Sequence, residues 1–224
     1  MEEWLLTSKE IEMIAEGVVD TLYMTLVSTG VGYLIGLPWG IVLTVTGKDG
    51  LHPNRVIYRV LDFITNIMRS VPFLIMLVLV IPITRFIVGK SYGSTATIVP
   101  LVISASPLIA RMVESSLQEV DKGVIEAAQA MGASNVQIVL RVLLGEGKIS
   151  LISGATITTG TILGYSAMAG TVGGGGLGDI AIRYGYYRYQ ANILFITVVL
   201  LVVLVQIFQL IGNLINKKLD KRKV

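Results

Sequence analysis

The chain contains no cysteine and a single histidine, His52. The lack of cysteine excludes disulfides and thiolate metal sites. Charged residues are also scarce, at 15% of the 224 residues, while 53% of the residues are hydrophobic. Together with a mean hydropathy of +0.74, this composition argues against a soluble domain and indicates an integral membrane protein.

The residue patterns that carry catalysis are missing too. No carboxylate pair falls within an apolar run and no metal-ligand spacing is present, so we expect neither an enzyme activity nor a bound metal. Gly145-Glu146-Gly147-Lys148 resembles part of a phosphate-binding loop, but Val142 and Ile149 stand where that motif needs Gly and Ser or Thr. The acidic residues lie in loops or near the ends of apolar runs, which disfavours transport driven by the chain's own proton or sodium relay.

Five long apolar runs predict an all-α membrane protein with five transmembrane helices. A hydrocarbon core of about 30 Å needs roughly 20 apolar residues in helical form. Residues 1–20 predict an N-terminal amphipathic helix at the membrane interface, in which Thr7 and Glu10 have the spacing of a capping box. A polar section, 114–150, separates the third and fourth runs. The five predicted spans are 21–46, 60–84, 94–113, 151–171 and 191–215.

The basic residues predict which side of the membrane each loop occupies. The chain ends in a basic tail, 216–224, which we place in the cytoplasm, and five spans then put the N-terminus outside. Most of the 18 Lys and Arg residues fall on the predicted cytoplasmic side. The net charge of +3 is therefore better explained by membrane topology than by nucleic-acid binding. This bias places section 114–150 in the cytoplasm. The basic residues predicted outside are Lys9, Arg85, Lys90, Arg183 and Arg188.

Section 114–150 contains a predicted short surface helix over 121–132. Asp121 is a suitable N-cap, and Gly132 can adopt the left-handed conformation that ends a helix. Because such a helix needs a surface to pack against, it fits a connector lying on its own protein as well as a contact with a partner. A second amphipathic piece follows through Val136, Val139, Val142 and Leu143. The apolar side of the first helix consists of Val120, Val124, Ala127, Ala128 and Met131.

In two of the apolar runs, the positions of polar or small residues require an explanation. In the first run, Gly32, Gly36 and Gly40 share one helical face, which either lets another helix approach closely or reflects the general abundance of glycine in membrane helices. In the second run, Arg69 is costly near mid-membrane, so it either anchors the helix at an interface or binds substrate. Pro72 follows within the same run.

The fourth run alternates hydroxyl residues with glycines, which fits a helix that lines a path as well as one that packs tightly. Thr161, Tyr165 and Ser166 are the pathway candidates within it. Met168 lies near the predicted outer end of this run. Its flexible thioether suits a gate on a dimer axis or contact with a thioether substrate, and core packing is the alternative.

Glu126-Ala127-Ala128, followed three residues later by Gly132, resembles the signature loop of binding-protein-dependent ABC importer permeases. Arg69-Ser70-Val71-Pro72 is similar to that family's second-helix motif, and the resemblance extends over essentially the whole chain. The family pattern continues after the glycine as Ile-x-Leu-Pro. Here Val142 replaces the isoleucine and Gly145 the proline, which leaves the exit geometry of the loop in question.

Within that family, the segments 126–133, 164–170 and 175–178 look like the methionine importer branch. The resemblance implies the type I ABC importer permease fold, a homodimer in the bacterial inner membrane, and two ATPase subunits on the cytoplasmic side. It also implies a substrate-binding lipoprotein or periplasmic protein outside. ATP and Mg would bind the ATPase, with no cofactor on this chain. Alternatives are a permease for another small amino acid or solute, a passive channel, or a non-transporting membrane scaffold.

The resemblance also assigns roles to the loop residues. Residues 121–132 would form a coupling helix that sits in a groove on the ATPase. Glu126 would contact polar groups there, Ala127 and Ala128 would permit close approach, and Gly132 would allow the sharp turn. Alternating access would follow if the two permease subunits rock between inward-open and outward-open arrangements.

Overall fold

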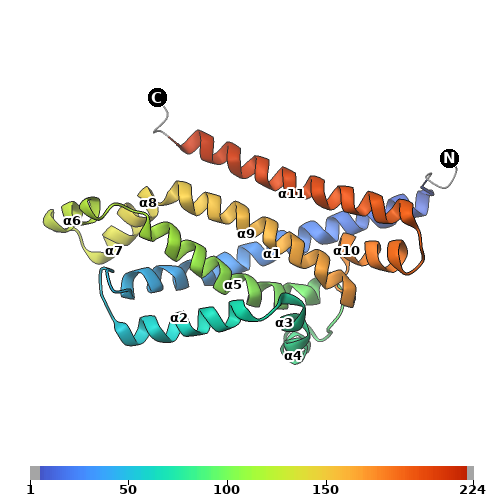
Figure 1. The fold of residues 1–224 in the computed structure, drawn as a ribbon, viewed down its shortest axis with the longest axis horizontal. Helices are drawn as coiled ribbons and strands as arrows, with labels where there is room; N and C mark the ends of the chain where they lie inside the picture. The colour runs from blue at the N-terminus through green and yellow to red at the C-terminus, as the bar shows by residue number, and fades with distance from the viewer. Residues whose placement is uncertain (1–5, 221–224) are drawn as a thin grey trace. The chain divides into compact units, whose positions relative to one another are not determined.

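The computed structural model describes residues 6–220, and every regular element in this part of the chain is a helix (Figure 1). The long helices are α1 (Ser8–Thr46), α5 (Ser94–Gln118), α9 (Lys148–Ala169) and α11 (Ala191–Leu219). Shorter helices connect them: α2 (Arg55–Ser70), α3 (Phe73–Leu79), α4 (Ile81–Val88), α6 (Lys122–Ala130), α7 (Asn135–Gln137), η2 (Ile138–Leu143), α8 (Leu144–Glu146), η3 (Gly170–Val172), α10 (Gly176–Ile180) and η4 (Ala181–Tyr186).

The predicted five spans and the helices of the structure differ in two places. Three helices, α1, α5 and α11, are long and apolar enough to cross a membrane, and a fourth span exists if the bent pair of α2 and α3 forms one. The run predicted at 60–84 is broken because Pro72 lacks an amide hydrogen and disfavours helix at the residue before it. Helix α9 is not counted among them, since its glycines and hydroxyls lower its hydropathy.

The segment predicted as a separate N-terminal helix over 1–20 is the beginning of α1, as far as the described residues show, because α1 continues unbroken from Ser8 to Thr46. Residues 1–5 lie outside the described part. The capping box is confirmed: the Thr7 amide donates to the Glu10 carboxylate at 2.7 Å, and the Glu10 amide donates to Thr7 Oγ1 at 3.4 Å. The predicted tail 216–224 continues α11 as far as Leu219, and residues 221–224 are not described.

The chain forms two compact units. The first contains residues up to Val31, Val71–Ala105 and Thr159–Gln209. Its core includes Ile14 and Leu177, which are buried together. At Gly176, φ is +75°, and an added Cβ would lie 2.7 Å from Thr21 Oγ1. This close approach lets Thr21 Oγ1 accept a hydrogen bond from the Leu177 amide at 2.9 Å, so α10 is fixed to α1.

The second unit contains Gly32–Ser70, Ser106–Thr158 and the chain from Leu210 onward. Here the predicted close approach at the glycine face is confirmed for two of its members. A Cβ on Gly36 would lie 2.7 Å from Ile109, and one on Gly40 would lie 2.6 Å from Val113. Because real Cβ atoms do not approach so closely, these glycines let α1 and α5 pack backbone to backbone.

Candidate functional site

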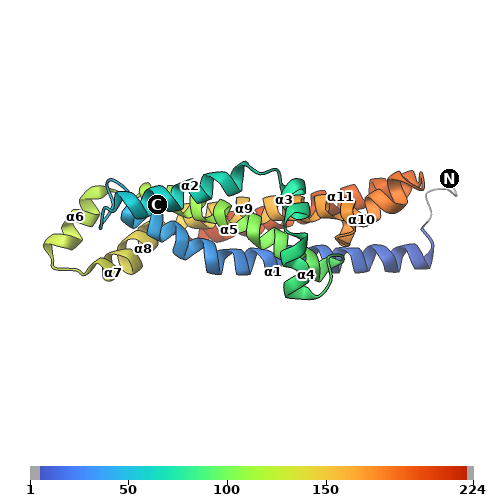
Figure 2. The ribbon, with the colours of Figure 1, turned by 90° about the horizontal axis from the view of Figure 1, so that it is seen from below.

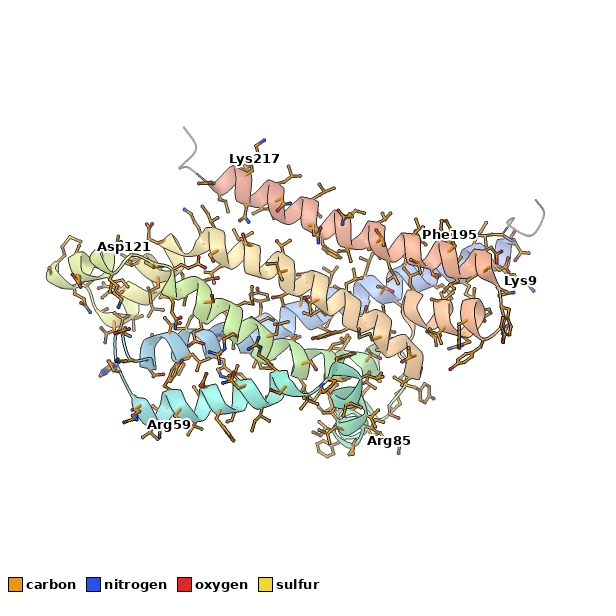
Figure 3. The ribbon with its side chains drawn as sticks, viewed as in Figure 1. Lys9, Arg59, Arg85, Asp121, Phe195 and Lys217 are labelled. Carbon is orange, nitrogen blue, oxygen red and sulfur yellow. The ribbon has the colours of Figure 1, made fainter. Side chains whose placement is uncertain are left out.

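The short helix after α5 has the ends that the sequence predicts. Asp121 Oδ1 accepts a hydrogen bond from the Gly123 amide at 2.7 Å, so the predicted N-cap is confirmed. At the other end Gly132 has φ of +79°, and its amide donates to the Gln129 carbonyl at 2.9 Å. The left-handed conformation costs a residue with a Cβ about 1–2 kcal/mol, which is why glycine suits this turn. Figure 3 labels Asp121 at the start of α6.

The predicted apolar face of this helix is only partly buried. Val120 and Ala128 are buried, whereas Val124 and Met131 are 43% and 81% exposed. Of the loop residues with predicted roles, Glu126 and Ala127 lie on the exposed side of α6, and Ala128 packs inward. The helix therefore offers a partner a surface of small and apolar side chains with one carboxylate, and Ala128 is its one buried side chain.

A second helical piece lies beside α6, as both views show (Figures 1 and 2). Ser134 and Gln137 form a reciprocal capping box, with bonds of 2.8 and 3.3 Å, which starts α7. The Ser-x-x-Gln spacing was the sequence signal for this start. The following turn is a π-helix, η2, which buries Ile138 and Leu143.

The predicted apolar face of this second piece is wrong in part. Val136 is 67% exposed, whereas Ile138, which was not assigned to that face, is fully buried. Ile138 and Leu143 stand five residues apart, the spacing of the i→i+5 hydrogen bonds of a π-helix, so a pattern read at α-helical spacing does not pair them. Gly145, which replaces the family proline, lies in α8, and a Cβ there would meet nothing within 4 Å. The exit from the loop is therefore a helical turn that does not depend on glycine.

A cavity of about 520 Å³ lies between α6 and the segment that joins α1 to α2. Glu126 and Gln129 line it from α6, and Tyr58 lines it from α2. Lys122 and Asp49 form an ion pair of 3.6 Å across the same region. Both side chains are 72% exposed, so this pair contributes little, on the order of 0–1 kcal/mol.

A network of charged and polar side chains joins α2 to α5 next to this cavity, and the sequence reasoning missed it. Arg111 Nη2 donates to Asp62 at 2.5 Å and to Asn66 Oδ1 at 2.9 Å, and Nη1 donates to Glu114 at 2.6 Å. Glu114 is 2% exposed and also accepts a hydrogen bond from the Tyr58 hydroxyl at 3.1 Å. The spacing of Arg111 and Glu114 on one helical face was a signal, but their partners lie far away in the sequence.

The second-helix motif marks the end of a helix. Arg69 and Ser70 are exposed in the last turn of α2, and Ser70 Oγ donates to the Asn66 carbonyl at 2.7 Å. Pro72 is the N-cap of α3. The exposure of Arg69 agrees with an anchoring role, and its role in transport stays a prediction.

The four pathway candidates of α9 lie in different surroundings. Tyr165 stacks on Phe73 with ring centroids 4.5 Å apart, and Ser166 is buried with its hydroxyl donating to the Leu163 carbonyl at 2.8 Å. Met168 is 52% exposed, so it does not pack in a core of the single chain. Thr161 is half-buried. Ser166 therefore packs within its own unit, and Met168 is the candidate that remains accessible.

In the described part of the chain, no group of three or more His, Asp or Glu side chains is arranged to hold a metal ion. What the structure does present is a multi-pass helical membrane protein with a capped, exposed helix after α5. The chain belongs to the family described as the binding-protein-dependent transport system inner membrane component, whose model matches residues 36–223.

Curated relatives match most of the chain. It is 51% identical, over 91% of its length and 90% of the relative's, to the "Probable D-methionine transport system permease protein MetI" of Vibrio cholerae. It is also 43% identical, over 91% of both chains, to the "Methionine import system permease protein MetP" of Bacillus subtilis.

Solved structures show the same fold. An inward-facing structure of the "MetNI methionine ABC transporter" matches 96% of this chain and 100% of that chain, with a TM-score of 0.95 and 47% identity. A structure described as an amino acid ABC transporter with histidines matches with a TM-score of 0.76 and 22% identity, covering 94% of this chain and 95% of that one, and at that identity it supports the fold alone.

Proposed function

We propose that this chain is the permease subunit of an ATP-driven importer that moves methionine, as the D-isomer, the L-isomer or both, across the bacterial cytoplasmic membrane. The observation that carries this proposal is α6, which presents Glu126 and Ala127 on a capped, exposed helix that a link of three residues joins to α5. The methionine assignment is supported by the 51% and 43% identical relatives, which are both named as methionine permeases.

The chain works as a homodimer with two ATPase subunits on the cytoplasmic side and a substrate-binding protein outside. The similarity to a chain of the MetNI transporter supports this assembly. ATP and Mg bind the ATPase. Five spans cross the membrane, with α2 to α4 as the second and α9 as the fourth, the N-terminus outside and the C-terminus in the cytoplasm.

Residues 121–132 couple the permease to the ATPase. The exposed side of α6 enters a groove on the ATPase, with Ala127 permitting close approach and Glu126 bonding to polar groups. Closure of the ATPase on ATP displaces α6, and the two permease subunits change from inward-open to outward-open. ATP and the loaded binding protein both favour the outward-open arrangement, and this differential affinity drives the transition.

Methionine passes between the subunits along α9. Met168 is accessible in the single chain and suits a gate at the dimer axis, because a thioether side chain adapts its shape and can contact a thioether substrate. Tyr165 and Thr161 are further pathway candidates.

The proposal is tested by reconstituting the chain with its ATPase and binding protein in liposomes and measuring uptake of labelled methionine. We expect ATP-dependent uptake that other small amino acids compete with poorly. Uptake of a different solute in place of methionine would overturn the substrate assignment. Ion conductance by the isolated chain, or its purification without any ATPase, would overturn the importer assignment.

A further inference from the structure

The network around Arg111 connects α2 and α5 in both directions. From α5, Arg111 donates to Asp62 and Asn66 of α2. From α2, Tyr58 donates to Glu114 of α5. The partners on α2 run from Tyr58 to Asn66, a length of about 12 Å along a helix. Contacts spread over that length oppose both sliding and rotation of one helix against the other.

The carboxylates outnumber the guanidinium in this cluster. Asp62 and Glu114 share the single charge of Arg111, and Glu114 is 2% exposed. A buried ion pair stabilises a fold poorly compared with apolar side chains of the same volume, because its charges lose their hydration. What such a cluster does supply is a fixed geometry, since a displacement of α2 against α5 separates Arg111 from Asp62 and takes the Tyr58 hydroxyl away from the buried Glu114 carboxylate.

The same cluster lies close to α6. Gln118, the last residue of α5, donates to Glu114 at 3.3 Å, and only residues 119–121 separate it from the first residue of α6. Tyr58 and Gln118 line the cavity that Glu126 lines from α6. A displacement of α6 is therefore transmitted to α5 through only three residues. The end of α5 that receives it is the end that carries the network.

We propose that Arg111 is a positioning residue for transport: it clamps α2 to α5 so that a displacement of α6 moves both helices as one body. This inference rests on the proposed function and deepens it, because it assigns a route by which movement of the coupling helix enters the membrane part of the unit. Without the clamp, α5 follows α6 and α2 stays behind, so ATP is hydrolysed with little transport.

The first test removes the network without leaving a lone buried charge. The triple variant Asp62→Asn, Arg111→Met, Glu114→Gln is purified with the ATPase and reconstituted with the binding protein. We expect normal co-purification, ATP hydrolysis near the wild-type rate, and roughly tenfold less methionine transported per ATP, within the range of known coupling free energies. Arg59→Gln is the matched control, because Arg59 is an exposed cation on α2 outside the network (Figure 3) and its loss leaves transport per ATP unchanged.

The second test uses the complex with its network intact and applies even if the triple variant does not assemble. The chain has no native cysteine, so Arg59→Cys on α2 and Ser115→Cys on α5 can carry the only two spin labels of the subunit. Both positions are exposed and lie outside the network. With labelled subunits diluted into unlabelled ones, we expect the same distance in the nucleotide-free and ATP-bound complexes.

The outcomes separate this inference from the proposed function. A spin-label distance that changes with ATP, or an assembled triple variant with wild-type transport per ATP, overturns the clamp while methionine import stands. If the wild-type complex moves no methionine with ATP, the proposed function is wrong. The positioning role of Arg111 in transport is then wrong as well.

Discussion

The rings of Phe73 and Tyr165 lie parallel, with centroids 4.5 Å apart, and join α3 to α9 within one unit. Phe73 is buried, whereas the hydroxyl of Tyr165 is not needed for the stacking. We expect Phe73→Ala to destabilise the unit by about 3–5 kcal/mol, as other large-to-small core substitutions do. Thermal unfolding in detergent measures this effect. Tyr165→Phe keeps the ring, so a comparable loss in that variant would show that the hydroxyl matters more than the stacking.

Valine at position 132 tests the turn after α6. Because Gly132 has φ of +79°, Gly132→Val strains the turn by about 1–2 kcal/mol or more and displaces Met131 and Ala133. We expect the variant to enter the membrane but to co-purify with less ATPase. Gly145→Val is the control, because that glycine is helical with open space around its Cβ position. Normal ATPase association and normal transport by Gly132→Val would contradict the proposal that residues 121–132 couple the permease to the ATPase.

Substitution of Asp121 is a milder change and tests the other end of α6. Asp121→Ala removes the oxygen that accepts from the Gly123 amide, and we expect a loss of about 1 kcal/mol in local helix stability. Hydrogen exchange should accelerate at the amides of α6 and stay unchanged in α10. Asp121→Asn keeps an accepting oxygen and should behave like the wild type. Equal acceleration in both variants would indicate that the charge, rather than the cap, protects the helix.

A cysteine at position 168 tests the gate. Since Met168 is 52% exposed and the chain has no native cysteine, Met168→Cys should form a disulfide between the two subunits under mild oxidation, seen as a dimer on a non-reducing gel. Ser166→Cys is buried within its own unit and should not cross-link. Absence of the dimer for Met168→Cys in assembled transporter would place residue 168 away from the subunit axis.

The sequence predicted those features that depend on a few neighbouring residues. Asp121 and Gly132 mark the ends of α6 because capping and left-handed turns are set within one helical turn. Pro72 is a local signal of the same kind, but residues 60–84 were predicted as one unbroken span. The Arg111 to Asp62 pair joins residues 49 positions apart, so it depends on which helices become neighbours, which no local pattern encodes. The π-helix at η2 shifted the buried positions for a related reason, since α-helical spacing was assumed.

The glycines of α1 also bear on how the helices move. Ile109 rests on Gly36 and Val113 rests on Gly40, so the contact repeats after four residues on both helices. A shift of one turn, about 5.4 Å, would bring Ile109 over Gly40 but would place Val113 over the side chain of Thr44. The glycines at 36 and 40 thus fix the register of α5 on α1, because a side chain stands at the next position that α5 would have to pass.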